Sequence, residues 1–512
     1  MNDPEQPTAS TLTVWSRHAA LDEGEPAPLP SLATRVAEAL QTVLTGLILA
    51  FIFRAFLVEP FIIPTGSMAE SLLGAHATRT CPACGWVFDF APLATATPTG
   101  VGFVRPTEIV CPNCQLRLTP TAADTVPKAG DRILVHKWPY VSGLIAPQRW
   151  DVLVFRDPAN PEQHYIKRLV GLPGERIELI AGDVFINDRI ARKPPEIQRA
   201  LWFIVFDQAH LPRATADFPP APRWRSLEPP PAAAAGWSGM DARIIRYDGL
   251  DDTPRRLSFN PNTAPEYLED LYGYDRGSGG NFVGDVRLVA ELTLHDGDGW
   301  CRWELVRPPF RFSAQVGCDG GVELAMTPLA NPDAQRVVAS LVRPPLPRDW
   351  PLVIEFGHVD YRVYLKLDNR ELLSTSDADY APDLAELRSS PRRAPVGLSL
   401  AASGVRLELH GLRIDRDVYY TRSAQTRRAF PGHPFTLNDG EFFVLGDNSP
   451  DSHDSREWTA RGPHLRADYR PGTVLRSQIV GPAAFVYLPG LLPVEPGGRL
   501  LVPDLGRTRF VR

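Results

Sequence analysis

One serine, Ser67, lies in a turn bounded by proline and glycine that follows directly on an apolar run, within the stretch Glu59–Met68. Because Pro64 and Gly66 punctuate the backbone there, we expect the Ser67 side chain to project from a fixed loop. A serine hydroxyl is a weak nucleophile and needs a general base within hydrogen-bond distance. The rest of the chain must therefore supply that base.

Histidine and lysine are the two residue types that could act as this base. The chain has 11 histidines, and His164 and His453 lie beside motifs described below, but none lies in a stretch that resembles a His-based triad. Lys167 has apolar neighbours in the stretch Tyr165–Glu175. A lysine of ordinary pKa is well under about 1% neutral at pH 8, and burial lowers that pKa by disfavouring the ammonium. The residues alone leave open that Lys167 and Arg168 are a solvated pair on a strand.

Four stretches of the chain resemble, in the same order, the characteristic boxes of type I signal peptidases. They are Glu59–Met68, Gly130–Val135 continued by Arg149–Phe155, Tyr165–Glu175, and Gly446–Arg456. That family consists of membrane-anchored serine proteases that remove signal peptides from secreted preproteins. The resemblance implies a β-barrel-like catalytic domain, a Ser67–Lys167 dyad that needs no cofactor, and signal peptides as substrates.

The resemblance also implies supporting roles around the dyad. The Ser67 backbone N–H and the Thr65 hydroxyl would bind the oxyanion of the tetrahedral intermediate, although threonine restricts the rotamer of that hydroxyl. Ser452 would hydrogen-bond and orient the lysine. The residues that match the structural support of the site are Asp447, Asp454 and Arg456.

The chain departs from the family pattern at three places. Trp150 and Thr459 each stand where a glycine is expected, and Ser449-Pro450 stands where Arg-Asp is common. These differences put the local shape of the loops in doubt and leave the dyad in place.

An apolar run at residues 36–57 is interrupted by Glu38, Gln41 and Arg54. It is long enough to cross a bilayer, which needs about 20 residues, with its charges near the ends. A buried core helix is the alternative on hydropathy alone, and a cleavable signal peptide is disfavoured because no cationic segment precedes the run. The resemblance favours an uncleaved anchor in the cytoplasmic membrane with the catalytic domain on the extracytoplasmic side. The proline-rich residues 1–35 are expected to be a mobile tail.

Two Cys-x-x-Cys pairs, Cys81/Cys84 and Cys111/Cys114, are separated by 26 residues. Each pair places two thiolates on one turn, and two such turns close a tetrahedral site suited to Zn²⁺. We expect a structural zinc ribbon over residues 78–120, with two disulfides or a redox site as alternatives. Cys301 and Cys318 flank two expected strands and could form a disulfide.

Short apolar segments separated by turn residues predict a β-rich catalytic domain in two parts, 58–199 and 429–512. Between them, residues 200–428 form an insertion that has no counterpart in the resemblance. Its first part is proline-rich and is expected to be irregular. From about 281 to 418 apolar residues alternate with polar ones, as at Val286–Leu294, which predicts half-buried antiparallel strands. The pattern resembles a β-sandwich of the concanavalin-A or laminin-G type, whose ligand the sequence does not identify. The chain is thus expected to be mainly β.

The 512 residues carry a net charge of −6, which gives no basic surface for nucleic acid. Two alternative functions fit parts of this sequence. Self-cleaving LexA-type repressors also use a Ser-Lys dyad, but they are soluble and carry a DNA-binding helix-turn-helix. A membrane-tethered adhesion or sugar-binding protein with an inert peptidase core is disfavoured because Ser67, Lys167 and Ser452 are all present. The lipid bilayer and the signal peptides of preproteins are therefore the expected partners.

Overall fold

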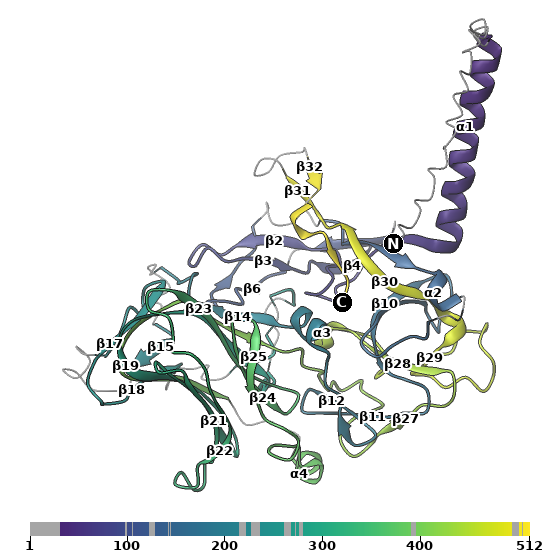
Figure 1. Cartoon of the computed structure of the whole chain (residues 1–512). Helices are drawn as coiled ribbons and strands as arrows, with labels where there is room; N and C mark the ends of the chain where they lie inside the picture. Colours follow the sequence, from purple (N-terminus) through teal and green to yellow (C-terminus); the bar gives the residue numbers. More distant parts are fainter. Residues whose placement is uncertain are drawn as a thin grey trace, which may run out of the picture. The chain divides into compact units, whose positions relative to one another are not determined.

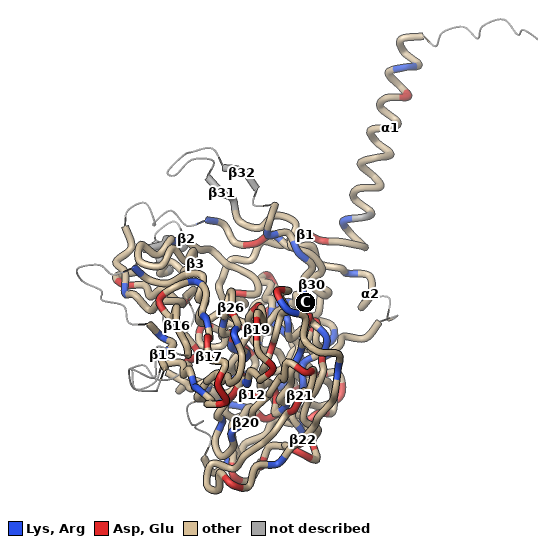
Figure 2. Tube along the Cα trace, turned by 60° about the vertical axis from the view of Figure 1, so that its left-hand side comes forward, with Lys and Arg blue, Asp and Glu red and all other residues tan. Residues whose placement is uncertain are grey.

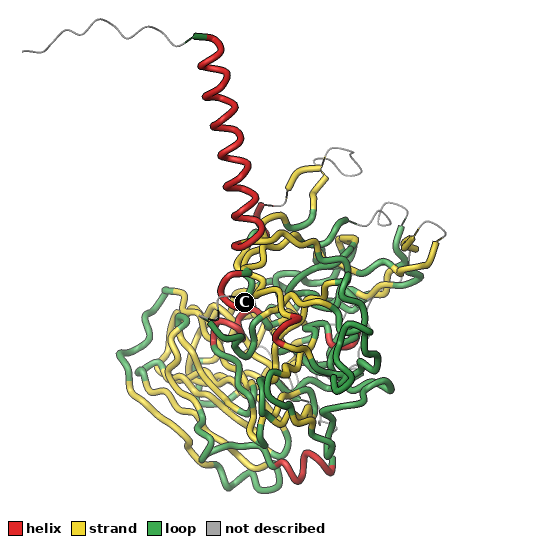
Figure 3. The backbone as a smooth tube through the Cα atoms, turned by 90° about the vertical axis from the view of Figure 1, so that its right-hand side faces the viewer, coloured by secondary structure: helices red, strands yellow, loops and turns green. Residues whose placement is uncertain are grey.

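The computed structural model describes residues 31–512 except 98–99, 105, 122–127, 142, 144, 214–221, 227–235, 261–267, 272, 276–279, 391–395, 494–500 and 504. The chain divides into two compact units, Met1–Phe56 and Leu57–Arg512, which are described separately. The expected tail at residues 1–35 lies almost wholly outside the described residues. Strands and loops make up most of the second unit (Figure 3), so the expectation of a mainly β protein is confirmed.

Helix α1 spans Leu32–Ile52 and continues as a short π-helix, η1, at Phe53–Leu57. It begins four residues earlier than the predicted run because Ser31 Oγ accepts a hydrogen bond from Thr34 N–H and caps the helix. No α1 residue is buried, and between Glu38 and Arg54 the helix carries no charge (Figure 2). The stretch Leu32–Leu57 is long and apolar enough to cross a membrane.

The second unit is built around an eight-stranded antiparallel sheet whose central path runs in the order β1-β8-β30-β9-β10-β28-β29, with β33 beside β30. The strands are β1 (Val58–Ile62), β8 (Arg132–His136), β9 (Val152–Arg156), β10 (His164–Gly171), β28 (Glu441–Leu445), β29 (Val474–Leu475), β30 (Ile479–Leu488) and β33 (Arg509–Phe510). Strands that precede the insertion thus pair with strands that follow it. The pairing of β10 with β28 brings the Lys167 strand beside the strand that leads into the Gly446 box.

A second, four-stranded sheet, in the order β13-β12-β11-β27, extends this half of the molecule. Its strands are β11 (Arg176–Ile180), β12 (Asp183–Ile186), β13 (Arg189–Ile190) and β27 (Phe435–Thr436). Two short helices, α2 (Trp138–Val141) and α3 (Pro195–Ala200), join these elements. Residues 58–199 and residues 429–512 therefore both contribute strands to each of these two sheets.

The cysteine pairs lie at the turns of two small hairpins. The first is β2 (Ala77–Thr80) with β3 (Val87–Phe90), and the second is β6 (Ile109–Val110) with β7 (Arg117–Leu118). A further hairpin, β4 (Leu93–Thr97) with β5 (Gly100–Val104), lies between them in the chain. These hairpins occupy residues 77–118, and the zinc ribbon over residues 78–120 stays a prediction.

The insertion forms one thirteen-stranded sheet (Figure 1). Its two long strands are β19 (Val286–Arg307) and β26 (Gly397–Arg416), which pair with each other along most of their length. The other strands of its later part are β20 (Phe310–Gly317), β21 (Gly321–Pro328), β22 (Arg336–Val342), β23 (Pro351–Val359), β24 (Arg362–Leu367) and β25 (Arg370–Ser374). The predicted alternation holds, since Val286, Leu288, Ala290, Leu292 and Leu294 are all buried in one core.

The first part of the insertion differs from the expectation of an irregular segment. It contributes five strands to the same sheet: β14 (Phe203–Asp207), β15 (Trp224–Ser226), β16 (Gly236–Ser238), β17 (Ile244–Gly249) and β18 (Arg255–Phe259). Three of them pair directly with β26. Proline-rich sequence concealed these strands because they are short and take their stability from β26, a strand distant in sequence.

Candidate active site

The loop that carries Ser67 is closed at its base by Asp131. The backbone of Asp131 accepts a hydrogen bond from Ile63 N–H at 3.0 Å and donates one to Leu73 O at 2.9 Å. Its fully buried carboxylate also accepts from Leu73 N–H at 3.1 Å. A side chain at Gly130 would place a Cβ 1.9 Å from Ile63 O, so this closure requires glycine there. The Gly130-Asp131 box thus fixes both ends of the loop that carries Ser67.

Ser67 and Lys167 are brought together although they are 100 residues apart in the chain. Lys167 lies on β10, and its Nζ donates a hydrogen bond to Ser67 Oγ at 2.5 Å. Only 6% of Ser67 and 4% of Lys167 are exposed. The two candidate histidines lie elsewhere, with His453 exposed beside Glu457 and His164 against the ring of Phe61. Lysine is therefore the base within reach of the hydroxyl.

Burial lowers the pKa of Lys167 from an ordinary value of 10.5 to about 8. Desolvation of the ammonium is the largest cause, and the nearby carboxylate of Asp454 opposes it. A lysine with a pKa near the working pH keeps a useful fraction of neutral amine and still binds a proton when it receives one. The environment of Lys167 is thus suited to a general base.

The hydrogen-bond partner of Ser452 in this structure is Asp454. The Ser452 hydroxyl donates a hydrogen bond to Asp454 Oδ2 at 2.7 Å, where the resemblance implied a bond to the lysine. A Cβ at Gly446 would lie 2.3 Å from Ser452 Oγ and 2.4 Å from Ser67 O. Only a glycine at this position lets the Ser452 side chain and the Ser67 backbone approach this closely.

Asp454 is held by a bidentate ion pair with Arg456, at 2.8 and 2.7 Å, and both side chains are buried. Burial by itself would raise the pKa of Asp454, but Arg456 and the hydrogen bonds from Ser452 and the Gly446 N–H hold it below its ordinary value. Arg456 also donates to Thr421 O and to Ser449 Oγ. Two of the three residues expected to support the site, Asp454 and Arg456, therefore form one connected network with Ser452.

Asp447 belongs to a second buried pair. Arg168 Nε and Nη2 donate to its two carboxylate oxygens at 2.7 and 2.6 Å, and both side chains are fully buried. The pair ties β10 to the segment after β28, directly beside Lys167. Arg168 is therefore no part of a solvated pair, and the sequence signal for it was its place next to Lys167 on an apolar strand.

Thr65 lies two residues before Ser67 and is exposed.

Trp150, which stands where a glycine was expected, has a φ of 78° and is buried. That backbone conformation favours glycine, which agrees with the expectation of a glycine at position 150. Asn448 was missed by the sequence reasoning, although it lies in the Gly446 box and its Nδ2 donates to Gly66 O at 3.0 Å.

The four cysteines of the two pairs come together, with all sulfur atoms within 4.8 Å of one another. Cys81 Sγ lies 3.6 Å from Cys114 Sγ, and Cys84 Sγ lies 3.7 Å from Cys111 Sγ. Four sulfurs bound at about 2.3 Å to a tetrahedral Zn²⁺ lie about 3.8 Å apart, so the donor set fits that ion.

The two cysteine turns have the same backbone hydrogen-bond pattern. Gly85 N–H donates to Cys81 O and Gln115 N–H donates to Cys111 O, each at 2.9 Å, and Gly85 and Gln115 both have positive φ. All six cysteines are free thiols, including Cys301 and Cys318.

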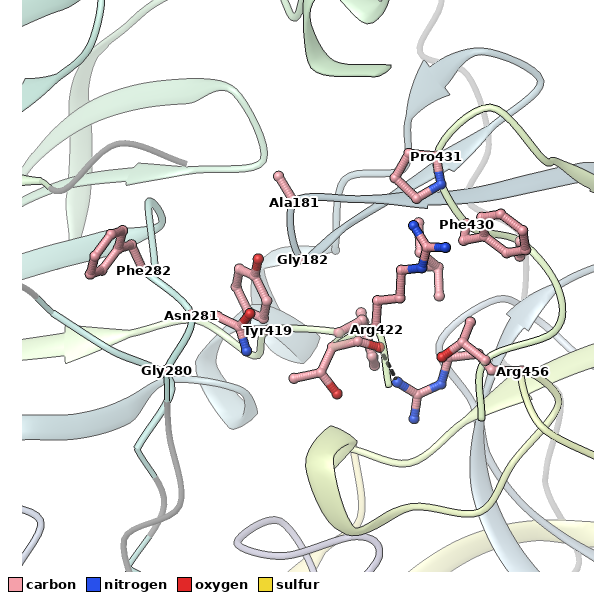
Figure 4. A pocket seen from close by; sticks show the side chains of 15 residues that line it. Ala181, Gly182, Gly280, Asn281, Phe282, Tyr419, Arg422, Phe430, Pro431 and Arg456 are labelled. Carbon is pink, nitrogen blue, oxygen red and sulfur yellow. Dashed lines mark hydrogen bonds between the residues drawn. The ribbon is translucent and has the colours of Figure 1, made fainter. Parts of the chain in front are cut away.

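A cavity of about 570 Å³ lies between the insertion and the segments that precede and follow it in the chain. Arg422, Phe430 and Pro431 line one side, and Asn281 and Phe282 lie toward the other (Figure 4). Of the site residues described above, Arg456 is the one that borders this cavity, through its hydrogen bond to Thr421 O at 2.6 Å.

Solved structures with some likeness to this chain include the carbohydrate-binding module CBM66 from Bacillus subtilis, with a TM-score of 0.24 and 12% identity over 38% of this chain and 95% of that one. The laminarinase from Rhodothermus marinus has a TM-score of 0.27 and 13% identity over 42% of this chain and 98% of that one. TM-scores this low support no argument about this chain.

Residues 115–202 and 402–488 match the family described as signal peptidase, peptidase S26. Signal peptidase I of Rickettsia typhi (strain ATCC VR-144 / Wilmington) is 29% identical over 141 residues, and that of Rickettsia massiliae (strain Mtu5) is 30% identical over the same length. Each alignment covers 28% of this chain and 39% of the relative, so the chain spans about two-fifths of the length of these relatives. The two matched segments, which carry Lys167 and the Asp447–Arg456 network, are therefore similar to type I signal peptidases of the S26 family.

Proposed function

We propose that this protein is a membrane-bound serine endopeptidase that removes N-terminal signal peptides from secreted preproteins. The observation that carries the proposal is the buried contact of 2.5 Å between Lys167 Nζ and Ser67 Oγ. Residues 115–202 and 402–488 are similar to signal peptidases, which supports signal peptides as the substrate class.

In the proposed mechanism, neutral Lys167 takes the proton of Ser67 as Oγ attacks the scissile carbonyl. The Ser67 N–H and the Thr65 hydroxyl stabilise the oxyanion. The protonated lysine then gives its proton to the departing amine, which leaves an ester between Ser67 and the signal peptide. Lys167 next removes a proton from a water molecule that attacks this ester, and returns the proton to Ser67 as the signal peptide is released.

We further propose that the segment Leu32–Leu57 anchors the chain in the cytoplasmic membrane with the catalytic unit on the extracytoplasmic side. Within the second unit, Leu57, Ile62 and Trp138 are large apolar side chains exposed by 37%, 55% and 38%. Leu57 and Trp138 lie near the start of β1, and Ile62 lies at its end, next to the loop that carries Ser67. These exposed apolar side chains suit contact with lipid.

The substrate would bind by strand addition. In the part of the chain that the structure describes, β1 pairs on one side with β8 and is an edge of its sheet. An extended peptide beside such an edge presents alternate side chains to pockets. The family resemblance implies small pockets that accept an Ala-x-Ala-like pattern before the cut.

For the cysteine cluster we propose one structural Zn²⁺ held by Cys81, Cys84, Cys111 and Cys114. The ion would replace a larger hydrophobic core in a module made of two-strand hairpins, which cannot be stable by themselves. It takes no part in the peptide cleavage.

The decisive experiment is cleavage of a preprotein by the purified chain in detergent. The wild type should release the mature protein, whereas Ser67→Ala and Lys167→Arg should be inactive, since arginine does not deprotonate at accessible pH. Lys366→Arg is the matched control, because Lys366 pairs with Glu355 on the insertion and should keep full activity. Near-normal turnover by Lys167→Arg would show that another group is the base.

The substrate class has its own test. In a series of preproteins with Ala, Ser, Leu or Phe directly before the scissile bond, Ala and Ser should be cleaved and Phe should not, because a pocket lined by packed side chains does not enlarge easily. Equal rates for Phe and Ala would contradict signal-peptide processing even if Ser67 is the nucleophile.

A further inference from the structure

A short segment of the insertion, Gly273–Asp275, lies directly against the loop that carries Ser67. It follows Leu271, whose carbonyl accepts a hydrogen bond from the buried Arg416 of β26 at 3.1 Å. A Cβ at Gly273 would lie 3.2 Å from the ring of Pro112 in the second cysteine turn. The segment therefore lies close to the cysteine module, and Leu271 just before it is tied to the insertion sheet.

Tyr274 covers the Gly66 side of the nucleophile turn. Its side chain is 1% exposed, and a Cβ at Gly66 would lie 1.9 Å from the tyrosine ring. Its hydroxyl donates to Ala75 O at 2.9 Å, and its carbonyl accepts from Ala91 N–H at 2.8 Å. The ring therefore limits how far the backbone just before Ser67 can move.

Asp275 acts on the same turn through Asn448. Asn448 Nδ2 donates to Asp275 Oδ1 at 2.6 Å and to Gly66 O at 3.0 Å. The Asn448 backbone N–H donates to Ser67 O at 3.1 Å. Asn448 is fully buried and Asp275 is 5% exposed. A hydrogen bond to an ionised carboxylate is stronger than a neutral one, so Asp275 orients the Asn448 side-chain amide, which holds Gly66 O. The backbone N–H of the same asparagine holds Ser67 O.

From these contacts we propose that Tyr274 and Asp275 are positioning residues for Ser67, so that the insertion forms part of the catalytic unit. The inference rests on the proposed function, which makes Ser67 the nucleophile. Neither side chain touches the reacting atoms, and both act on the backbone of residues 66 and 67. A nucleophile displaced by about 1 Å loses about a hundredfold in rate, which is the range in which such positioning becomes measurable.

The test compares Asp275→Ala, Asp275→Asn and Tyr274→Phe in the full chain, with preprotein cleavage as the readout. Asp275→Ala should lower kcat by about tenfold to a hundredfold with KM within about threefold of the wild type. Asp275→Asn keeps an oxygen that can accept from Asn448 and should recover to within about threefold of the wild type. Tyr274→Phe, which loses only the bond to Ala75 O, should fall between the two.

Asp333→Asn is the matched control, since Asp333 is an exposed acid elsewhere on the insertion. It should have wild-type kcat, and an equal loss in this variant would overturn the inference. Wild-type kcat in Asp275→Ala would overturn it too, while leaving the proposed function intact. The recovery of kcat in Asp275→Asn separates positioning from a folding defect. If the Asp275 carboxylate were needed only for stability, replacing it by an amide would not restore kcat.

A second readout does not depend on peptidase activity. In Ser67→Cys the rate of alkylation at position 67 by iodoacetamide, followed by mass spectrometry of that peptide, reports the position of the side chain relative to Lys167. Adding Asp275→Ala should change this rate at least about threefold, whereas adding Asp333→Asn should not. If the wild type fails to cleave preproteins, the proposed function is wrong, and the alkylation rate alone then decides whether Asp275 positions residue 67.

Discussion

The pH dependence of cleavage is set by Lys167 if this lysine is the general base. Its pKa falls from 10.5 to about 8 on burial. A lysine of pKa 8 is about 9% neutral at pH 7 and about 91% neutral at pH 9, whereas an ordinary lysine is only about 0.03% neutral at pH 7. The structure thus raises the reactive fraction at pH 7 by about 300-fold.

The assay is the initial rate of preprotein cleavage at substrate concentrations far below KM, measured from pH 6 to pH 10 in detergent. We expect kcat/KM to rise about tenfold between pH 7 and pH 9 with a slope of one and a midpoint near 8, and then to level off. His164→Gln and His453→Gln should show the same profile. A midpoint near 6.5 that disappears in one of these variants would show that a histidine is the base.

The same pKa change predicts a dependence of stability on pH with a definite sign. Because the folded state releases the Lys167 proton at a lower pH than the unfolded state, unfolded chains bind more protons between pH 8 and 10.5, and stability rises with pH there. Below pH 8 the buried ammonium costs about 3 kcal/mol. Lys167→Met should therefore be more stable than the wild type at pH 7, and the difference should shrink toward pH 10 in urea unfolding.

Three further predictions concern the surroundings of the site. Asp447→Ala leaves the fully buried Arg168 without its carboxylate partner and should lower the free energy of unfolding in urea by about 3 to 5 kcal/mol. Asp468→Ala breaks an exposed pair with Arg466 and should lower it by under about 1 kcal/mol. Equal losses would contradict the role given to burial. Gly446→Ala brings a methyl group to 2.3 Å from Ser452 Oγ and should lower kcat by about a hundredfold without loss of zinc, and wild-type kcat would refute the close packing. Purified protein should contain about one equivalent of zinc, which Cys81→Ser should lose together with several degrees of Tm; cysteines that react with alkylating reagents only after reduction would indicate disulfides instead.

The sequence alone determined the chemical groups of the site and the secondary structure around them. The Pro/Gly-bounded turn at Ser67, the apolar strand at Lys167 and the Gly446 box are local patterns that depend on backbone preference and period-two alternation. The same is true of the cysteine pairs and of the strands in the second half of the insertion. Each of these features is encoded within about ten adjacent residues.

Only the tertiary structure decided which of these groups meet. Strand pairing across an insertion of more than two hundred residues puts Lys167 against Ser67 and Arg168 against Asp447. It also brings Ser452 to Asp454, Tyr274 against Gly66 in the loop that carries Ser67, and Asp275 to Asn448. No local pattern marks these contacts, because a hydrogen bond between distant residues depends on how whole sheets pack. For the same reason the pKa of Lys167 could not be known beforehand, since desolvation depends on every chain segment that covers the amine.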